Sequence, residues 1–285
     1  MAENNSIVSF GDLGPPAKAL IEAIERGVGE LFLPWQMRRV AKAAMDVRKV
    51  EVLSDIDVRN IESRALQRSL HEETEHQRNM EAIMSLAVEK IQGDPSKIDL
   101  KERWVRKFFE QARKISDAEL QALWAEILAM EAKGSDEFSL KTLSLLSDLE
   151  QSDALLFTKL CSFWVSGTYT GPLVIDIKDS IYTDNDLEYS ALMHLEYLGL
   201  IHFAPDGLRV FFKEKELEEV VNQEGVLTLD YFDTKVSISE NVIQPKASFG
   251  IGIAVPTEAG RQLQKVCSAK PVKDFPEYIK KKEQF

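Results

Sequence analysis

The sequence predicts a mainly α protein whose C-terminal part is a smaller α+β unit. Apolar residues recur every three or four positions over most of residues 15–165, which is the period of an amphipathic helix. After residue 170 the apolar runs become short and rich in β-branched and aromatic residues, which is typical of strands. We expect the N-terminal helical region to contain one long helix and an αα-hairpin.

The first expected helix covers residues 15–33 and begins at two prolines. It ends in the apolar run 31–35, which is followed by a basic cluster. We predict an interaction surface in this segment, formed by Phe32, Trp35, Arg38, Arg39 and Lys42. An apolar stripe beside basic residues is typical of a helix that lies on a membrane, and also of a helix that docks on another helix. Residues 15–49 therefore support both interpretations.

Residues 56–92 are predicted to form one long helix that ends at Gly93-Asp94-Pro95. Its middle, residues 71–79, has no apolar residue, which is typical of a solvent-bridging helix or of a charged coiled coil. His71 and His76 invite a metal-binding interpretation. The zincin motif needs two histidines four positions apart, however, and these are five apart. We therefore predict no metal site.

Residues 104–131 predict the αα-hairpin. Trp104, Phe108 and Ala112 share one helical face, and Trp124 lies on a second apolar stripe. Between the two helices, residues 116–119 (Ser-Asp-Ala-Glu) read as a capping box with Ser116 as the N-cap. Aromatic residues at helical spacing usually lie in a core, so we expect the tryptophans to be buried.

The hairpin also resembles a known sequence signature. The matching residues are Trp104, Phe108, Ala112, Ser116-Asp117, Leu120-Gln121, Leu123-Trp124, Ile127-Leu128-Ala129, Glu131, Phe138-Ser139-Leu140 and Thr142-Leu143. This pattern resembles a bacterial domain-of-unknown-function family and, more distantly, abortive-infection alpha-type proteins of phage defence. The resemblance covers residues 13–165 and departs at 134–137, where a Pro-Gly turn is expected. It implies a bacterial cytoplasmic setting and a link to defence, and it brings no catalytic residues.

The C-terminal part is predicted to alternate helices and strands. A helix at 186–198 precedes a hairpin of strands 200–203 and 208–212, and further strands follow at 226–232 and 250–255. Thr257 is expected to cap a short helix. Segments 195–201 and 255–263 resemble the end of the third helix and the segment after the wing in winged-helix domains. The resemblance implies a winged-helix-like unit with an insertion of about 40 residues before Gly252.

The chain is long enough for two modest domains, with 285 residues of which 44% are apolar. We divide it into an N-terminal amphipathic helical segment (1–55), a helical domain (56–150), a winged-helix-like α+β domain (151–270) and a basic tail (271–285). The tail contains prolines and lysines, and we expect it to be an exposed arm.

Charge argues against nucleic acid as a partner. Residues 150–240 carry 17 acidic and 6 basic side chains, a net charge of −11. The helix at 186–198 is where a winged-helix domain would read DNA, and it has no Lys or Arg. A recognition helix needs cationic side chains to neutralise phosphate.

No pattern with known chemistry supports an enzyme. Cys161 and Cys267 lie far apart in the sequence and in dissimilar settings, which suits a reducing compartment. Cys161 has the context of a helical core, where thiols are usually inert. The sequence contains no GxSxG, P-loop or GxGxxG motif. We predict no catalytic residue and no cofactor.

We therefore expect a non-enzymatic, cytoplasmic bacterial interaction or regulatory protein, acting in phage defence through a protein partner or a second copy of itself. The absence of a signal peptide and of a long apolar run favours the cytoplasm. One alternative is a membrane-acting abortive-infection effector that uses residues 15–49. Another is a DNA-binding regulator that uses the winged-helix-like domain.

Overall fold

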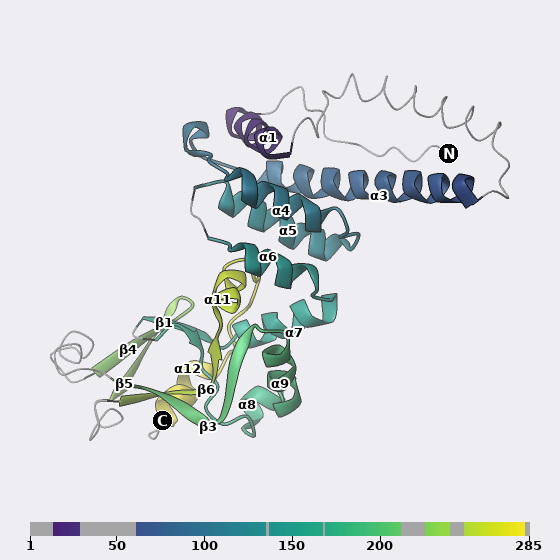
Figure 1. Cartoon of the computed structure of the whole chain (residues 1–285). Coiled ribbons are helices and arrows are strands. Elements are labelled where there is room, and N and C mark those ends of the chain that lie inside the picture. The colour runs from purple at the N-terminus through teal and green to yellow at the C-terminus, as the bar shows by residue number, and fades with distance from the viewer. Residues whose placement is uncertain are drawn as a thin grey trace, which may run out of the picture. The chain divides into compact units, whose positions relative to one another are not determined.

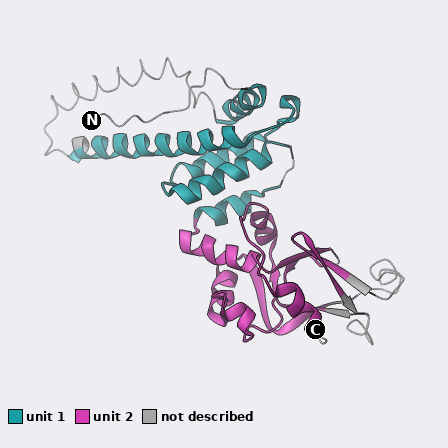
Figure 2. Cartoon of the chain, turned by 180° about the vertical axis from the view of Figure 1, so that it is seen from behind, with its two compact units in different colours: residues 1–147 teal, residues 148–285 magenta. Residues whose placement is uncertain are grey.

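Helices make up the N-terminal part of the chain, and helices with short antiparallel sheets make up the C-terminal part, as the sequence predicts. The computed structural model describes residues 14–28, 61–134, 137–167, 169–211, 226–239 and 248–282. They belong to two compact units, unit 1 (Met1–Ser147) and unit 2 (Asp148–Phe285), which Figure 2 colours separately. The surface predicted at Phe32, Trp35, Arg38, Arg39 and Lys42 lies outside the described residues.

Unit 1 is helical in all of its described elements. They are α1 (Pro15–Val28), α3 (Ile61–Lys90), the short 3-10 helix η2 (Pro95–Lys97), α4 (Glu102–Ala112), α5 (Ala118–Glu131) and α6 (Leu140–Ser147). Helix α3 packs along α5, α1 packs on α4, and α4 packs on α6 (Figure 1). The predicted long helix and αα-hairpin are thus both present.

An aromatic seam holds the hairpin of α4 and α5 together. The rings of Trp104 and Phe108 stack at 5.0 Å, and Phe108 meets Trp124 edge-on at 5.0 Å. All three side chains are buried. The indole N–H of Trp104 donates to the carbonyl of Phe138 at 2.7 Å, which ties α4 to the segment that enters α6. The prediction that the tryptophans are core residues is confirmed.

The cap of α5 differs from the predicted one. The N-cap is Asp117, whose carboxylate accepts from the backbone N–H groups of Glu119 at 3.0 Å and Leu120 at 2.9 Å. The expected cap at Ser116 is therefore wrong by one residue. A carboxylate at this position satisfies two free N–H groups and also interacts favourably with the positive end of the helix dipole, which a hydroxyl does less well.

The apolar face of α1 is buried inside unit 1. Leu20 and Ile24 are fully buried. Gly27 lies so close to α4 that an added Cβ would meet the side chain of Val105 at 2.8 Å, and the Arg106 guanidinium donates to the Gly27 carbonyl at 2.8 Å. In the described part of residues 15–49, the apolar stripe therefore faces another helix.

Helix α3 changes character along its length. Its last part is core, with Ile83, Met84 and Ala87 fully buried. The polar segment before it is mostly exposed or half-buried, and its charges pair along the helix, as Arg68 and Glu72 do at 3.7 Å. Asn79, at the junction, donates to the carbonyl of Arg113 at 2.9 Å.

Unit 2 combines short helices with two small sheets. Its elements are α7 (Gln151–Cys161), β1 (Trp164–Gly167), β2 (Gly171–Pro172), α8 (Ser180–Thr183), α9 (Tyr189–Tyr197), β3 (Ile201–Phe211), β4 (Val226–Tyr231), β5 (Thr234–Ser239), β6 (Ser248–Pro256), α11 (Glu258–Gln264) and α12 (Phe275–Lys281). One sheet has the strand order β2-β1-β4-β5, and β3 pairs with β6 in the other. All of these pairings are antiparallel.

The hairpin predicted at 200–212 is absent. Residues 201–211 form one continuous strand, β3, which pairs with β6 from Ile201↔Pro256 to Phe211↔Ser248. The supposed turn residues lie where the register shifts between Phe203 and Leu208. Pro205-Asp206-Gly207 therefore makes an irregularity within a long strand, because β6 offers partners on both sides of it. Gly207, at φ +80°, supplies the required left-handed conformation.

The described part of the C-terminal segment, residues 271–282, packs on the rest of unit 2. The expectation of an exposed arm is therefore wrong for these residues. Phe275 and Ile279 of α12 are buried. The Phe275 ring meets Phe163 at 5.0 Å and Tyr231 at 5.1 Å. The sequence suggested an arm because lysines surround these two apolar residues.

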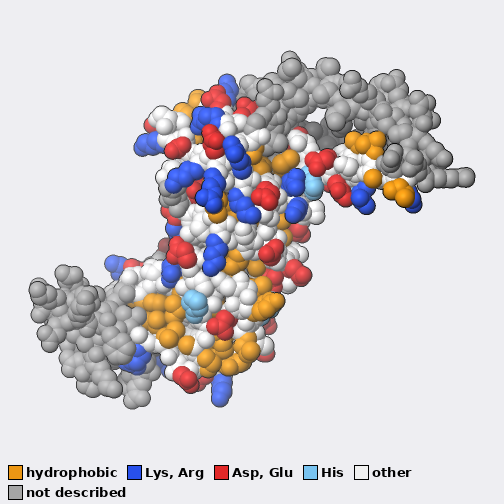
Figure 3. Space-filling view, viewed as in Figure 1, with side chains coloured by type: hydrophobic (Ala, Val, Ile, Leu, Met, Phe, Trp, Pro, Cys, Tyr) orange, Lys and Arg blue, Asp and Glu red, His pale blue; other side chains and the backbone are white. Residues whose placement is uncertain are grey.

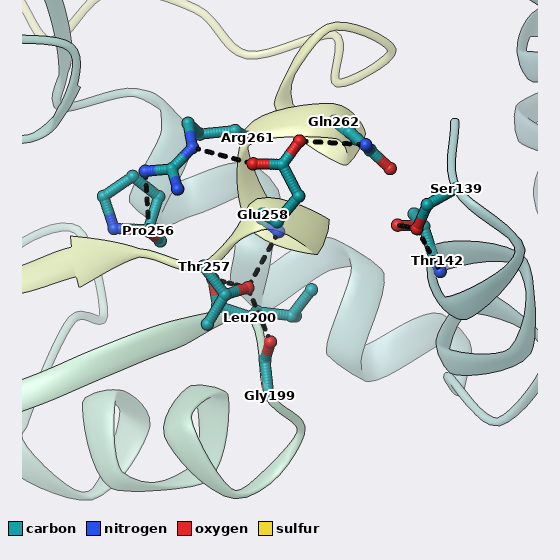
Figure 4. Close-up of polar contacts among 10 residues, drawn as sticks. Ser139, Thr142, Gly199, Leu200, Pro256, Thr257, Glu258, Arg261 and Gln262 are labelled. Carbon is teal, nitrogen blue, oxygen red and sulfur yellow. Dashed lines mark hydrogen bonds and ion pairs between the residues drawn. The ribbon is translucent and has the colours of Figure 1, made fainter. Parts of the chain in front are cut away.

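Thr257, directly after β6, is the N-cap of α11, as predicted. Its hydroxyl accepts from the Gly260 N–H at 3.1 Å and donates to the Gly199 carbonyl at 2.7 Å (Figure 4). The Arg261 guanidinium donates to the Pro256 carbonyl at 3.0 Å. The cap thus also holds the chain that leaves α9, because Gly199 follows Leu198, the C-cap residue of that helix.

Candidate functional site

Helix α9 presents an apolar stripe to solvent. Tyr189, Met193 and Tyr197 follow one another at intervals of four, so they lie along one face of the helix. Their exposed fractions are 48%, 53% and 86%. In Figure 3 hydrophobic side chains gather over the region of α7 and α9. Single exposed apolar residues are ordinary, but an aligned stripe of large ones is typical of a binding surface.

Other residues of α9 fix the helix in unit 2. Leu192 and Leu195 are fully buried. His194 Nε2 lies 2.7 Å from Asp153 Oδ1, which joins α9 to α7. The Glu196 carboxylate accepts from the Phe203 N–H at 2.9 Å, which joins α9 to β3. The stripe is therefore carried by a helix with anchors on two neighbouring elements.

Tyr189 is positioned by a further contact. Its ring meets the ring of Phe203 edge-on at 4.9 Å, and Phe203 is itself half-buried on β3. The stripe therefore continues from α9 onto the start of β3. A tyrosine held in this way loses little conformational freedom when a partner binds.

The charges around the stripe are acidic. Glu188 at the N-cap of α9 and Glu196 within it are exposed, as are Asp184 and Asp186 before the helix. Lys159 of α7 pairs with one of these carboxylates, that of Asp186, at 2.7 Å. The helix itself carries no Lys or Arg. Phosphate would be repelled here, whereas a protein surface with basic residues around an apolar centre would be attracted.

Unit 1 has a contrasting surface. A shallow, open hollow between α4 and α6 is lined by Arg103, Lys107, Glu110, Leu140, Lys141 and Ser144. Lys and Arg side chains gather over α4 in Figure 3. Within the hollow, Lys107 lies 3.8 Å from Glu110. Flexible surface cations in an open hollow are also the ordinary solvated face of a helix, so this region defines no site by itself.

The two cysteines, which the sequence placed in dissimilar settings, both lie in unit 2. Cys161 ends α7 and is fully buried, whereas Cys267 lies just beyond α11 and is partly exposed. Burial raises the pKa of Cys161, and a hydrogen bond from Cys161 lowers the pKa of Cys267.

The other candidate residues do not come together. His71 is exposed on α3, and His76 lies 3.7 Å from Glu73 of the same helix. In the ranges that the structure describes, no group of three His, Cys, Asp or Glu side chains is arranged to hold a metal. None of the helices in those ranges is both long and apolar enough to cross a membrane.

The stripe on α9 is not among the features predicted from the sequence, although its signal is present there. Tyr189, Met193 and Tyr197 alternate with Leu192 and Leu195 so that apolar residues lie on two faces. A short helix that is apolar on two faces must bury one face and expose the other unless something covers both.

The fold and this surface define a two-unit protein in which a helical unit is followed by a mixed α/β unit. The chain belongs to the family described as proteins of unknown function DUF2806, whose model matches residues 63–280. The match includes α9 and both cysteines and excludes Phe32–Lys42, and it extends further toward the C-terminus than the expected 13–165. No curated protein and no solved structure matches the chain.

Proposed function

We propose that this chain is a non-enzymatic bacterial interaction protein that regulates a protein partner through the exposed face of α9. The observation that carries the proposal is the aligned stripe of Tyr189, Met193 and Tyr197. Tyr and Met are enriched at protein interfaces because they contribute large contact areas. The anchors of α9 hold the stripe in place before a partner arrives.

We infer a winged-helix-like arrangement for unit 2 from the order of its elements. Helices α7, α8 and α9 precede strands β3 and β6, and Val174 makes a single bridge to Gly252 of β6. The hairpin β4-β5 occupies the expected insertion and pairs with β1. In this arrangement α9 takes the place of the DNA-reading helix.

The residues of α9 favour a protein over DNA at that place. Lys and Arg supply most of the affinity for phosphate, and α9 carries neither, while Glu188 and Glu196 flank its exposed face. An apolar centre with an acidic rim suits a partner with an apolar groove and a basic rim. A fold used elsewhere for DNA can carry a different function when its surface residues differ.

Site-specific photo-crosslinking tests this proposal. A photoreactive phenylalanine analogue is placed at Tyr197 in the cells that produce the protein, and at exposed Lys270 as a control position in the same unit. We expect one protein species to crosslink at position 197 and not at 270. Adding Met193→Glu should reduce that product at least tenfold, because a buried charge opposes docking.

A matched variant separates the stripe from general hydrophobicity. Phe232, on the β4-β5 turn, is exposed to a similar degree as Tyr189. Phe232→Glu should leave the product at position 197 unchanged. Equal loss with Phe232→Glu, or no product at position 197, would contradict the proposal.

Three further outcomes would favour other functions. A salt-dependent shift of random duplex DNA that Tyr197→Glu abolishes would favour the DNA-binding alternative. Flotation with anionic liposomes, lost in Leu31→Glu/Trp35→Glu, would favour the membrane effector, although Leu20 and Ile24 of its proposed stripe are buried in unit 1. Turnover in a hydrolase or nuclease screen, abolished by one substitution, would contradict the non-enzymatic proposal.

The role in phage defence is a separate part of the proposal, supported by the resemblance of the hairpin region to abortive-infection alpha-type proteins. It predicts that deleting the gene raises phage plating efficiency on its host. Restoring the wild-type gene should reverse the increase, and restoring Met193→Glu should not. Unchanged plating across a panel of phages would remove the defence role and leave the proposed interaction surface untouched.

A further inference from the structure

Unit 1 carries a surface whose charge is complementary to the stripe on α9. The hollow between α4 and α6 is lined by Arg103 and Lys107 from the first helix and by Leu140 and Lys141 from the second. Three cations thus accompany an apolar side chain, and Lys and Arg side chains gather over α4 in Figure 3. The stripe has the opposite composition, an apolar centre with an acidic rim, so the two surfaces attract each other.

The cations of the hollow are available to a partner. Arg103 and Lys141 are exposed, and neither makes an ion pair in the part of the chain that the structure describes. Lys107 lies 3.8 Å from Glu110, the acidic residue of the lining. Three cations and one carboxylate leave the lining with a net charge of +2. The hollow therefore keeps a positive charge after its internal pairing.

The shapes of the two surfaces are also compatible. The stripe lies along one face of a helix and ends at Tyr197, which is 86% exposed. The hollow lies between two helices that pack on each other, and its volume is about 520 Å³. An amphipathic helix that lays its apolar face in a groove is a recurring mode of protein recognition. The stripe supplies the helix for this mode, and the hollow supplies the groove.

Two copies of α9 are poor partners for each other. Such a contact would bring Glu188 and Glu196 of one copy close to the same residues of the other, and like charges across an interface are unfavourable. Two hollows would repel each other for the same reason. Charge therefore favours a contact between unlike surfaces.

We propose that the partner of the α9 stripe is the hollow between α4 and α6 of a second copy of this chain, which rests on the proposed function of α9 and names its partner. The contact joins unlike surfaces, so every pair of copies retains one free stripe and one free hollow. Further copies add head to tail, which gives rings or filaments. Assembly increases with protein concentration, and salt weakens it because salt screens the charges of both rims.

Sedimentation velocity of the full-length chain tests this assembly with two variants. Met193→Glu places a charge on the stripe, and Arg103→Glu/Lys141→Glu reverses the charge of the hollow. The wild type should form dimers and larger species as its concentration rises, and salt raised from about 0.05 to about 0.5 M should weaken association by about tenfold. Each variant alone should stay monomeric. Their mixture should form dimers and nothing larger, because one variant supplies the hollow and the other supplies the stripe.

A charge-matched variant controls for the general effect of lost cations. Lys97 and Lys114 are exposed residues of unit 1 that do not line the hollow. Lys97→Glu/Lys114→Glu changes the net charge as much as Arg103→Glu/Lys141→Glu does. It should assemble like the wild type.

Crosslinking locates the contact without any change in the hollow. Chains that carry the photoreactive group at position 197 are prepared in isotopically light and heavy forms and mixed. Irradiation should join a light chain to a heavy chain, and mass spectrometry should find the attachment on a peptide of α4 or α6. This readout decides the proposal even where a hollow variant fails to fold.

Several results would overturn the proposal. They are a wild type that stays monomeric at every concentration and salt, assembly that persists in Arg103→Glu/Lys141→Glu, variants that do not combine when mixed, and equal loss in the charge-matched control. A different protein captured at position 197 would overturn it and leave the proposed function of α9 standing, whereas no product at that position would remove both.

Discussion

The two units build their aromatic cores from different residues. The core of unit 1 contains Trp104, Phe108 and Trp124, and all six tyrosines of the chain lie in unit 2. In unit 2 the Tyr182 hydroxyl donates to the Leu173 carbonyl at 3.0 Å. The Tyr231 hydroxyl donates to the Ser162 carbonyl at 2.7 Å and accepts from the Val272 N–H at 2.6 Å.

The difference follows from how each unit satisfies its backbone. Helices pair most of their own N–H and C=O groups, so the core of unit 1 needs side chains that fill space. Unit 2 contains irregular segments near residues 162, 173 and 272, where tyrosine hydroxyls bond the carbonyls of Ser162 and Leu173 and the N–H of Val272. Tyrosine fills space and also supplies a hydroxyl for those groups. The stability of unit 2 should therefore fall when a tyrosine hydrogen bond is removed or the pH is raised. The stability of unit 1 should fall mainly when a core side chain is made smaller.

The largest effect is expected from Trp124→Ala. Trp124 is completely buried, and its removal should cost about 3–5 kcal/mol of unfolding free energy. Hydrogen exchange should rise in peptides of α3, α4 and α5 and stay unchanged in β3 and β6. The control is Tyr197→Ala, at 86% exposure, which should alter stability by less than about 0.5 kcal/mol. Equal effects of the two substitutions would contradict the assignment of Trp124 to a core.

A pair of glycines tests the dependence of unit 2 on close backbone approach. Gly252 and Gly207 have φ angles of +81° and +80°, so alanine is strained at both. At Gly252 the new Cβ would also collide with the Val174 carbonyl, whereas at Gly207 the nearest heavy atom lies 4.0 Å away. We expect Gly207→Ala to cost about 1 kcal/mol and Gly252→Ala about 2–4 kcal/mol. Urea unfolding followed by circular dichroism measures both, and similar costs would show that the collision relaxes.

Tyr231→Phe isolates one hydroxyl of the unit 2 core. It keeps the ring and leaves the Ser162 carbonyl and the Val272 N–H without that partner, so we expect a loss of about 1–3 kcal/mol. Burial raises the pKa of Tyr231 to about 12 from its usual 10.0, although a hydrogen bond from the Val272 backbone opposes the shift.

The same hydroxyl predicts a pH dependence. Because the unfolded tyrosine ionises first, its contribution to stability is complete below pH 10 and is lost as the pH rises toward 12. Urea midpoints at pH 8, 10 and 12 should fall more steeply for the wild type than for Tyr231→Phe. Parallel curves would contradict the pKa argument and leave the hydrogen-bond prediction standing.

The smallest effect is expected where α12 meets the rest of unit 2. The Asp179 carboxylate accepts from Lys282 at 2.8 Å and from the Tyr278 hydroxyl at 2.5 Å. Burial would raise the pKa of Asp179, but these hydrogen bonds and the Lys282 charge hold it below its usual 3.8. The pair is partly solvated, so Asp179→Asn should cost under about 1 kcal/mol.

This contribution is present above pH 3.8 and is lost as the pH falls through the lower, folded-state pKa. The difference between wild type and Asp179→Asn should therefore vanish in acid. Thermal unfolding between pH 2.5 and 7 measures it, and a difference that does not shrink as the pH falls below 3.8 would contradict the sign.

The helical unit could be predicted from the sequence in more detail than unit 2. The helical period of residues 104–131 predicted the hairpin and its buried tryptophans, because helix contacts are local and repeat every turn. The sequence placed the N-cap of α5 one residue too early. Ser116 and Asp117 both suit an N-cap, and only the path of the backbone selects between them. In unit 2 the residues Pro205-Asp206-Gly207 suggested a turn, and the distant β6 made them part of a strand instead.

The sequence by itself determined the fold class, the hairpin core and the lack of cations on α9, because each depends on residue types at short spacing. Only the tertiary structure decided that Phe275 belongs to the core of unit 2, where its ring meets Phe163 and Tyr231, and that the face of α9 with Tyr189, Met193 and Tyr197 is the exposed one. These features join residues that are far apart in the chain. Their pairing depends on how the elements pack, and local propensity does not encode it.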